Sequence, residues 1–424
     1  MKILIVGGGG REHAVAWKLS KENNVEKIYC APGNAGIAKV AQCVNISDSD
    51  IENLVKFAKE NNIDLTVVGP EVPLVNGIVD EFEKEGLKIF GPNKECSTFE
   101  GSKSFSKDFM IRHNIPTAKY KEYTNLDEAI SEIDSFGYPV VIKADGLAAG
   151  KGVVIPENRE DAINTLREIM SDKKFGSAGE KIVVEEFLSG IETSILAFVD
   201  NDTIVPMVSA KDHKKVYNFE KGPNTGGMGT FSPSEIYTDE LSKEISEKVL
   251  NRTLEGFKKD NLNYKGVLFI GLMITEDGPK VLEYNVRFGD PETQSVLFRL
   301  ETDLHKIMEA ILDNKLKDIE INYKKEEAVC VMLTSGGYPE DYEKGKVITG
   351  IEDLDEDIVV FHSGTKMLDG NLVTNGGRVI GITTSAGSVE EAAKKVYKNI
   401  EKINFEGMHY RTDIGIKFCE EISF

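Results

Sequence analysis

Cysteine and histidine are scarce in this sequence, and neither residue occurs in a disulfide or metal-binding pattern. The five cysteines are widely spaced among 424 residues and form no C-x-x-C pair. An odd, scattered set of this kind is typical of buried thiols in a reducing compartment and argues against a disulfide framework. The six histidines show no H-x-x-x-H spacing, so a structural zinc site or a zinc hydrolase is disfavoured as well.

The sequence also lacks a long apolar run and an excess of positive charge. The longest clearly apolar run, residues 267–274, is far shorter than the ~18 to 20 residues that a membrane span needs. The apolar stretch at the N-terminus is too short for a secretory signal. The net charge of −20 gives no sequence-wide basis for binding nucleic acid or an anionic membrane. We therefore expect a cytoplasmic protein that acts on small molecules and binds neither nucleic acid nor membranes.

The length predicts two to four domains, and the first hundred residues predict a parallel sheet. Short apolar segments expected to form strands lie at residues 2–6, 27–30, 64–68 and 88–90. Amphipathic segments expected to form helices lie between them, at residues 11–20, 51–61 and 74–86. Strands that alternate with helices form a parallel sheet covered on both faces. The segments that follow each strand then meet at the carboxyl edge of the sheet, where such sheets bind ligands.

The rest of the chain predicts two further domains. A helix is expected at residues 101–114, and residues 117–190 read as a smaller α/β unit. The following segment combines antiparallel strands with long helices at residues 238–258 and 293–313. We therefore expect an α/β protein with an N-terminal parallel-sheet domain (1–101), an α+β central domain (102–325) and a small C-terminal α/β domain (326–424).

Four consecutive glycines, residues 7–10, directly follow the first predicted strand. They do not complete a G-x-G-x-x-G pattern, which disfavours a dinucleotide-binding fingerprint. Glycines before a helix still present backbone N–H groups and the positive end of the helix dipole, which suit a phosphate. A tight turn without a ligand is the alternative. Together with residues 31–36 and 69–74 on the same edge, the glycines predict a pocket for a sugar phosphate.

A lysine on a predicted strand, Lys143, is followed by a loop of small residues that contains Gly150, Lys151 and Gly152 and returns into another strand. Small residues let backbone amides approach triphosphate oxygens, and the lysine supplies positive charge. The alternative is a flexible hairpin with surface lysines. The pattern favours a strand–loop–strand flap over the phosphates of a nucleotide.

The acidic pair Glu185 and Glu186 ends the next predicted strand and precedes Phe187 and Leu188. A short connector of this kind pairs its backbone with the edge of an adenine, and Glu192 is placed to accept ribose hydroxyls. A solvated strand edge is the alternative interpretation, which the preceding lysine loop makes less favourable.

The sequence E-Y-N-V-R places Glu283, Asn285 and Arg287 at alternate positions. On a strand these three side chains point to one face. Two oxygen ligands and a cation on one face are what a magnesium–triphosphate site with a stabilising arginine requires. A solvent-facing polar strand is the alternative.

A glycine-rich, charged stretch occupies residues 211–229 between a predicted strand and a predicted helix. Long loops of this type are usually functional or disordered. The mixed charges suit the positioning of a zwitterion such as an amino acid.

These motifs together resemble those of the ATP-grasp ligases, in the same order. More narrowly, the segments GGGGREHA, APGNAG, GPEVPL, KADGLAAGKGV, GPNTGGMG and NVRFGDPETQ are similar to those of the glycinamide ribonucleotide synthetase family over nearly the whole chain. The resemblance implies an ATP-grasp fold in the central domain, with a mobile lid at about 117–190. It also implies a carbon–nitrogen ligase of de novo purine biosynthesis. Such an enzyme joins glycine to 5-phospho-β-D-ribosylamine through a glycyl phosphate, giving glycinamide ribonucleotide, ADP and phosphate.

The resemblance further implies the roles of individual residues. The ATP-binding set is Lys103, Lys143, Gly150, Lys151, Gly152, Glu185, Glu186, Phe187, Leu188 and Glu192. The substrate-binding set is Gly8, Gly9, Gly10, Arg11, Asn34, Glu71, Gly226 and Gly227. Glu283 and Asn285 would bind Mg²⁺ or Mn²⁺. Arg287 would act in catalysis, with Asp212 and Asp290 as candidates for the substrate amines. We expect a monomer.

Two positions depart from these patterns, and three other classes of protein compete with this assignment. Gly271 stands where many ATP-grasp enzymes carry a second acidic metal ligand, and residues 216–220 differ from the family's usual segment. Another ATP-grasp ligase of purine synthesis should lack the GPNTGGMG loop. A non-catalytic nucleotide sensor could lose the E-x-N-x-R residues, and all three are present. An NAD-dependent oxidoreductase is disfavoured by the incomplete glycine fingerprint.

Overall fold

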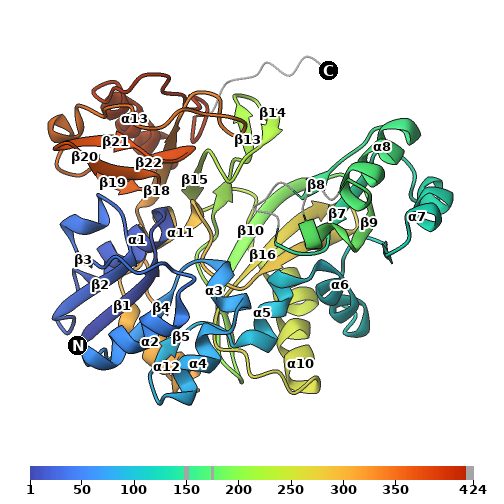
Figure 1. Ribbon diagram of the computed structural model, residues 1–424, viewed down its shortest axis with the longest axis horizontal. Helices are drawn as coiled ribbons and strands as arrows, with labels where there is room; N and C mark the ends of the chain where they lie inside the picture. Colours follow the sequence, from blue (N-terminus) through green and yellow to red (C-terminus); the bar gives the residue numbers. More distant parts are fainter. Residues whose placement is uncertain (148–151, 173–175, 417–424) are drawn as a thin grey trace.

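The computed structural model describes residues 1–147, 152–172 and 176–416 of the chain. Figure 1 shows the N-terminal domain below the C-terminal domain on one side, with the central domain beside both. A smaller lobe that contains α7 (Leu126–Glu132) and α8 (Arg159–Met170) projects away from the rest. The predicted three-part α/β architecture is confirmed. The projecting lobe comprises the residues that we expect to act as a lid, and we refer to it by that name.

The N-terminal domain is built on a parallel sheet of strand order β3-β2-β1-β4-β5. The strands are β1 (Lys2–Gly7), β2 (Lys27–Pro32), β3 (Gln42–Cys43), β4 (Leu65–Val68) and β5 (Ile89–Phe90). The helices are α1 (Gly10–Leu19), α2 (Ile51–Glu60), α3 (Glu71–Val75) and α4 (Ile78–Lys84). The single helix predicted at 74–86 is wrong, because Gly77 adopts a φ of 88° and separates α3 from α4.

The lid contains an antiparallel sheet of order β6-β9-β7-β8. Its strands are β6 (Tyr120–Tyr123), β7 (Val140–Ala144), β8 (Val153–Val154) and β9 (Ile182–Glu186). Before the lid, the helix predicted at 101–114 is confirmed as α6 (Lys103–Arg112), and a break separates it from a preceding helix that was not predicted, α5 (Lys94–Gly101). The break occurs at Ser102, whose backbone is extended and whose hydroxyl accepts a hydrogen bond from the N–H of Phe105. Ser102 therefore caps α6 and turns its first residue towards the lid.

The central domain is organised around the antiparallel sheet β11-β10-β16-β17. Its strands are β10 (Ile191–Val199), β11 (Ile204–Pro206), β16 (Gly266–Thr275) and β17 (Gly278–Asn285). The helix predicted at 238–258 contains a π-helical turn (Ser246–Leu250) between α9 (Asp239–Ile245) and α10 (Asn251–Lys259). The helix predicted at 293–313 is two helices, α11 (Glu292–Arg299) and α12 (Leu304–Leu312), because the backbone becomes extended at Leu300.

The C-terminal sheet takes strands from two distant parts of the chain. Its order is β12-β15-β18-β22-β19, with α13 (Val389–Ile400) packed against it. The strands are β12 (Lys211–Asp212), β15 (Gly229–Ser232), β18 (Glu327–Thr334), β19 (Val359–His362) and β22 (Arg378–Ala386). The prediction of a loop over residues 211–229 is therefore wrong. This stretch forms β12, the hairpin of β13 (Lys215–Tyr217) and β14 (Lys221–Asn224), and the start of β15, while β20 (Thr365–Leu368) and β21 (Asn371–Thr374) form a second hairpin.

The three domains meet at an aromatic junction. Trp17 of α1 stacks on Phe298 of α11, with ring centroids 5.3 Å apart, and meets the edge of Phe361 from β19 at 5.5 Å. All eight residues of α11 are buried. Among the described residues, no helix combines the length and apolar character needed to cross a membrane.

Two buried histidines cross the same junction. The ring nitrogen Nδ1 of His13 in α1 accepts a hydrogen bond of 2.8 Å from the backbone N–H of His362 in β19. The two rings lie 5.6 Å apart, and the ring of His362 also contacts the hydroxyl of Thr365. Burial lowers the pKa of His13 to about 3 and that of His362 to about 4. Both rings are therefore neutral in the folded protein at neutral pH.

This arrangement predicts a loss of stability in mild acid. The unfolded chain protonates each histidine near pH 6.5, whereas the folded chain resists protonation down to about pH 4. The stabilising effect is thus complete above pH 6.5 and is lost as the pH falls, by about 1 kcal/mol per histidine at pH 5.5. We expect the thermal unfolding midpoint to fall less between pH 7 and 5.5 in His362→Gln than in the wild type. Equal falls in both proteins would contradict this prediction.

Candidate active site

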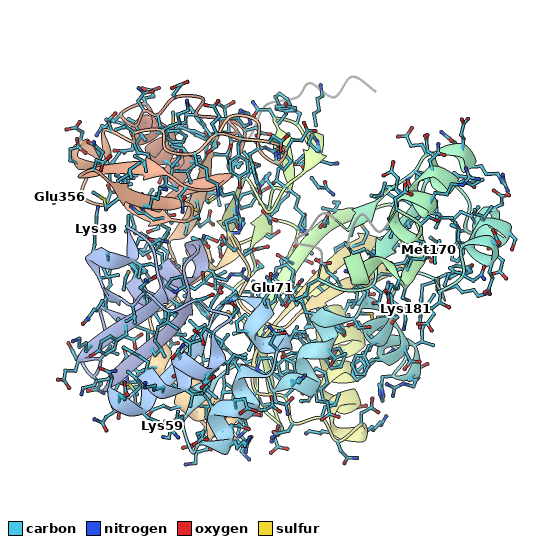
Figure 2. The ribbon with its side chains drawn as sticks, in the orientation of Figure 1. Lys39, Lys59, Glu71, Met170, Lys181 and Glu356 are labelled. Carbon is cyan, nitrogen blue, oxygen red and sulfur yellow. The ribbon has the colours of Figure 1, made fainter. Side chains whose placement is uncertain are left out.

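The predicted site residues converge where the N-terminal sheet edge, the central sheet and the lid face one another. Glu71, the first residue of α3, lies near the middle of the molecule, whereas Met170 and Lys181 lie on the lid (Figure 2). Arg11 comes from the start of α1, and Arg287 follows β17. These segments are far apart in the sequence and lie together in the fold.

Two arginines and two glutamates form a network at the centre of the site. The side chains of Arg11 and Arg287 both contact Glu71, at 3.4 and 3.5 Å, and Arg287 also contacts Glu100 at 2.9 Å. Burial raises the pKa of Glu71, but the two arginines outweigh burial and hold it below its ordinary value. Burial raises the pKa of Glu100 despite the charge of Arg287. The network joins Arg11 and Glu71, predicted to bind substrate, to Arg287, predicted to act in catalysis.

Glu283, Asn285 and Arg287 lie together, as their spacing predicts. The Asn285 amide donates to Glu283 at 3.3 Å and its oxygen accepts from Arg287 at 3.4 Å. β17 ends at Asn285, so Arg287 lies just beyond the strand. Gly271 pairs with Glu283 on the neighbouring strand, so the position opposite Glu283 supplies no side-chain ligand.

The donor set fits a divalent cation with few protein ligands. Glu283 and Asn285 supply a carboxylate and an amide oxygen. No group of three or more histidine, cysteine or acidic side chains that could hold a metal ion occurs within the described ranges. Mg²⁺ is typically bound by one or two carboxylates together with substrate phosphates and water, so the two residues suit such an ion.

Lysines line the side of the site that faces the lid. The Lys103 ammonium donates to the carbonyl of Gly146 at 2.8 Å, and Lys143 lies 2.7 Å from Glu185 and 3.3 Å from the carbonyl of Leu282. Burial lowers the pKa of Lys103. Gly152 is buried and directly precedes the returning strand, while Gly150 and Lys151 lie outside the described residues.

The connector after β9 differs from its predicted arrangement. The Glu185 side chain is buried between two lysines, one of which, Lys107, was not among the predicted site residues. Glu186 accepts a hydrogen bond of 2.9 Å from the backbone N–H of Lys119. Leu188 is buried, whereas 41% of Phe187 is exposed. The acidic side chains thus hold the connector in place through contacts within the protein, whereas the sequence predicts that they face a ligand.

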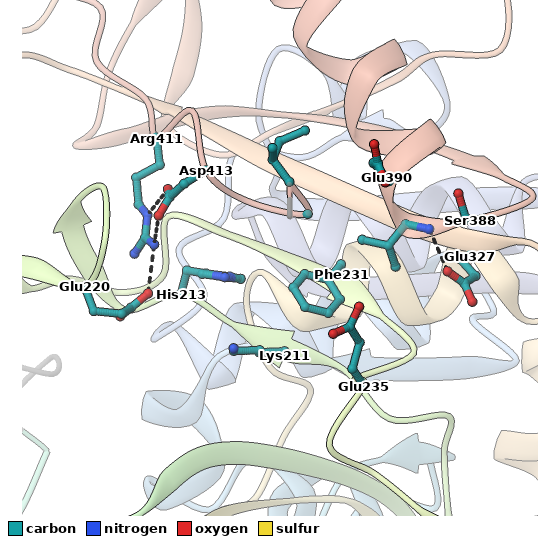
Figure 3. Close-up of a pocket in the computed structure, with 13 residues that line it drawn as sticks. Lys211, His213, Glu220, Phe231, Glu235, Glu327, Ser388, Glu390, Arg411 and Asp413 are labelled. Atoms are coloured by element: carbon teal, nitrogen blue, oxygen red, sulfur yellow. Dashed lines mark hydrogen bonds and ion pairs between the residues drawn. The ribbon is translucent and has the colours of Figure 1, made fainter. Parts of the chain in front are cut away.

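The side chains of residues 211–214 point alternately to two opposite sides of the chain. Lys214 contacts Glu192 at 2.8 Å, and the carboxylates Glu192, Glu283 and Asp212 raise the pKa of Lys214 although burial lowers it. Lys211 and His213 instead line a cavity of about 370 Å³ on the other side, beside Phe231, Arg411 and Asp413 (Figure 3). The site therefore receives Asp212 and Lys214, and this cavity is separate from it.

Asp212 and Glu292 form a buried acidic pair. Burial raises the pKa of both, and the charge of Glu292 raises the pKa of Asp212 further. One oxygen of Asp212 is buried and has no hydrogen-bond partner among the described residues. Gly227 has a φ of 114°, and a Cβ there would lie 2.8 Å from this oxygen and 2.4 Å from Pro291. The glycine therefore allows the chain to approach the acids closely.

Asp290 and the segment around Gly226 are held by the C-terminal domain. Arg378 lies 3.3 Å from the carboxylate of Asp290 and also donates to the carbonyls of Asp290 and Gly226. The Tyr338 hydroxyl accepts a hydrogen bond from the N–H of Gly226. Burial raises the pKa of Asp290, but Arg378 and Arg11 outweigh burial and lower it.

The glycine-rich edge is more occupied than the sequence predicts. The N–H of Gly9 donates to Glu12, which caps α1, so this group is not free for a phosphate. Asn34 donates to the carbonyls of Gly8 and His362, and its oxygen accepts two backbone N–H groups. Asn34 thus clamps the edge to the C-terminal domain. A Cβ at Gly10 would lie 2.6 Å from the hydroxyl oxygen of Ser363.

Sequence reasoning missed several charged residues of the site: Lys107, Glu100, Lys214, Glu292 and Arg378. Lys214 alternates with Asp212, and Glu292 lies two residues after Asp290, so both had a local signal. The others come from segments that carry no recognised motif, and only the fold brings them to the site.

Comparison with known proteins identifies the family. The phosphoribosylglycinamide synthetase profiles match in three parts: the N domain at residues 1–100, the ATP-grasp (A) domain at 101–293 and the C domain at 328–417. A phosphoribosylamine–glycine ligase from Caldanaerobacter subterraneus subsp. tengcongensis is 52% identical over 98% of this chain and 99% of its own.

Solved structures agree with these matches. The crystal structure of phosphoribosylamine–glycine ligase from Thermotoga maritima has a TM-score of 0.85 and 35% identity, covering 98% of this chain and all of that one. A biotin carboxylase from Campylobacter jejuni shares the fold, with a TM-score of 0.76 and 14% identity over 96% of this chain and 92% of its own. The resemblance found in the sequence is confirmed, and the chain belongs to the phosphoribosylglycinamide synthetase family.

Proposed function

We propose that this chain joins glycine to 5-phospho-β-D-ribosylamine at the expense of ATP, giving glycinamide ribonucleotide, ADP and phosphate in purine biosynthesis. The observation that carries the proposal is the position of Arg287. It contacts Asn285 on the nucleotide side and Glu71 on the edge of the N-terminal sheet. Arg287 thus connects a nucleotide-type site to a second site lined by Arg11, as a ligase with two further substrates requires. We expect it to act in the cytoplasm as a monomer.

The chemistry follows from the low reactivity of a carboxylate. An oxygen of the glycine carboxylate attacks the γ-phosphorus of ATP, and ADP leaves. The amine of phosphoribosylamine then attacks the acyl carbon of the glycyl phosphate, loses a proton, and phosphate leaves. Lys143 and Lys103 would face the transferring phosphoryl group, and Arg287 would offset its negative charge. Closure of the lid would exclude water from the acyl phosphate.

Glu283 and Asn285 would hold the divalent cation, Mg²⁺ or Mn²⁺. When bound, the ion would neutralise charge on the phosphate oxygens. Lys103, Lys143 and Lys214 surround Glu283 and lower its pKa despite burial. The carboxylate is therefore ionised and ready to act as a ligand at neutral pH.

The buried acids would recognise the glycine ammonium group. Asp212 has an unpartnered oxygen in the described structure and lies beside Gly227, with Glu292 nearby. An ammonium group would supply the counter-charge and hydrogen bonds that this buried pair otherwise needs. On the opposite side, the start of α1 and Arg11 would receive the phosphoribosylamine. The small space around Gly227 suits an amino acid without a side chain.

The direct test is the incorporation of labelled glycine into a phosphorylated product, with phosphoribosylamine generated in the assay. We expect product only when glycine, phosphoribosylamine, ATP and the divalent metal are all present, with one ADP formed per product. Omission of each component in turn is the control. ATP hydrolysis that does not depend on glycine, or product formation from another carboxylate, would refute the proposed reaction. The proposal of a nucleotide site would still stand.

Arg287→Ala should lower turnover by at least ~100-fold, the scale of one preorganised electrostatic group, while ATP binding is largely kept. Because this variant leaves Glu100 buried without its cation, thermal unfolding must be measured alongside. Arg112→Ala, which removes an exposed ion pair with Asp108 and Asp260, is the matched control. Near-normal turnover in a folded Arg287→Ala protein would remove this residue from the mechanism.

Gly227→Ala should lower turnover by at least ~10-fold, because the added methyl group meets Pro291 and Asp212 and a positive φ costs an alanine about 1 kcal/mol. Gly345→Ala is the matched control. Its φ is also positive, at 84°, and a Cβ there would meet no described atom within 4 Å. Steady-state rates with glycine as the varied substrate check the prediction. If turnover fell equally in the two variants, backbone strain alone would explain the loss.

A further inference from the structure

A buried carboxylate shared by two lysines lies behind the nucleotide side of the site. Glu185 of β9 lies 2.8 Å from Lys107 of α6 and 2.7 Å from Lys143 of β7. Lys107 and Glu185 are each only 2% exposed. Lys107 also donates to the hydroxyl of Thr117, which in turn donates to the carbonyl of Val281. The lysine thus ties the lid strand β9 and the first residue of the lid to the central domain.

Two ammonium groups and one carboxylate leave the triad with one surplus positive charge. In a dry environment an ionised carboxylate needs a counter-ion, and removal of its last partner is strongly unfavourable. Among the described residues, the two lysines differ in their second hydrogen bond: Lys107 donates to the hydroxyl of Thr117 at 2.7 Å, whereas Lys143 donates to the carbonyl of Leu282 at the longer distance of 3.3 Å. Lys143 is therefore the more weakly held of the two lysines, and it is the one that can bind an additional group.

We propose that Lys107 is a positioning residue that keeps Glu185 neutralised and in place when Lys143 turns from Glu185 to the phosphates of ATP. The inference depends on the proposed function, because it takes Lys143 to be a phosphate ligand. Lys107 lowers the free-energy cost of moving Lys143 from Glu185 to the phosphates, because Glu185 keeps one counter-ion and never becomes an isolated buried anion. The neighbouring connector is held at the same time, because Glu185 pairs with Tyr120 and Val141 in the lid sheet.

The charge state of Lys107 is consistent with this role. Burial lowers its pKa to about 8, with the like charge of Lys143 acting in the same direction and Glu185 opposing both. Lys107 therefore remains mainly protonated at neutral pH. Burial raises the pKa of Glu185, but the two lysines outweigh burial, so the carboxylate stays ionised.

The test compares Lys107→Met with the double variant Lys107→Met/Glu185→Gln. In the single variant, Lys143 becomes the only counter-ion of Glu185, so we expect the KM for ATP to rise at least ~10-fold, the scale of one charged hydrogen bond. The KM for glycine should change less than ~2-fold. In the double variant Glu185 no longer carries charge, so Lys143 is released and the KM for ATP should recover by at least ~3-fold relative to the single variant. Lys107→Arg should lie between Lys107→Met and the wild type.

If the role of Lys107 were purely structural, the KM for ATP of the double variant would be as high as that of Lys107→Met, or higher. That result, or an unchanged KM for ATP in Lys107→Met, would overturn the inference. Lys121→Met on β6, whose exposed ammonium contacts Glu128 and Glu132, is the matched control and should keep the wild-type KM. Calorimetric binding of ATP with Mg²⁺ to each folded variant separates the two proposals. If the wild type binds no ATP or forms no product, the proposed function fails. If the wild type forms product and Lys107→Met binds ATP normally, only the role of Lys107 fails.

Discussion

Complete burial of helix α11 is the constraint on which the arrangement of the domains depends. All eight of its residues are buried although several are polar, so each polar group needs a partner inside the protein. Arg299 donates to Ser232 of the C-terminal sheet and to the carbonyl of Lys324, and Gln294 donates to Asp290 at the site. The helix also packs against α1 of the N-terminal domain and β18 of the C-terminal domain. The contacts that bury α11 therefore also fix the position of its first residue, Glu292, in the site.

Charges in the site are likewise balanced across domains rather than within one. Arg11 meets Glu71, Arg287 meets Glu71 and Glu100, and Arg378 of the C-terminal domain meets Asp290. Ligands that carry phosphate, carboxylate and ammonium groups must compete with these internal counter-ions. A site of this kind can exchange one partner for another without leaving a buried charge isolated, which keeps the cost of binding low.

The sequence was informative wherever the relevant residues are consecutive. Four of the five strands of the N-terminal sheet follow from short apolar segments, whereas the two-residue strand β3 was not predicted. The contacts among Glu283, Asn285 and Arg287 follow from their alternation. Prediction failed where a distant partner decides the outcome. β15 joins the C-terminal sheet by pairing with the distant strand β18, and β12 then pairs with β15. Glu185 contacts Lys107, which lies 78 positions away by sequence number. The helices break at Gly77 and Leu300 because the backbone leaves the helical conformation there. The apolar pattern continues across both positions, so it predicts one uninterrupted helix in each case.

The aromatic junction has a spectroscopic consequence. Trp17 is the only tryptophan in the chain, and it lies parallel to Phe298, with an interplanar angle of 6° and the ammonium of Lys21 3.8 Å from the ring centroid. Its emission spectrum is thus an intrinsic reporter for one location, the contact of α1 with α11 and β19. Separation of the three domains should therefore change the tryptophan emission without any added label. The lid contains no tryptophan, so observing its movement requires an introduced fluorophore.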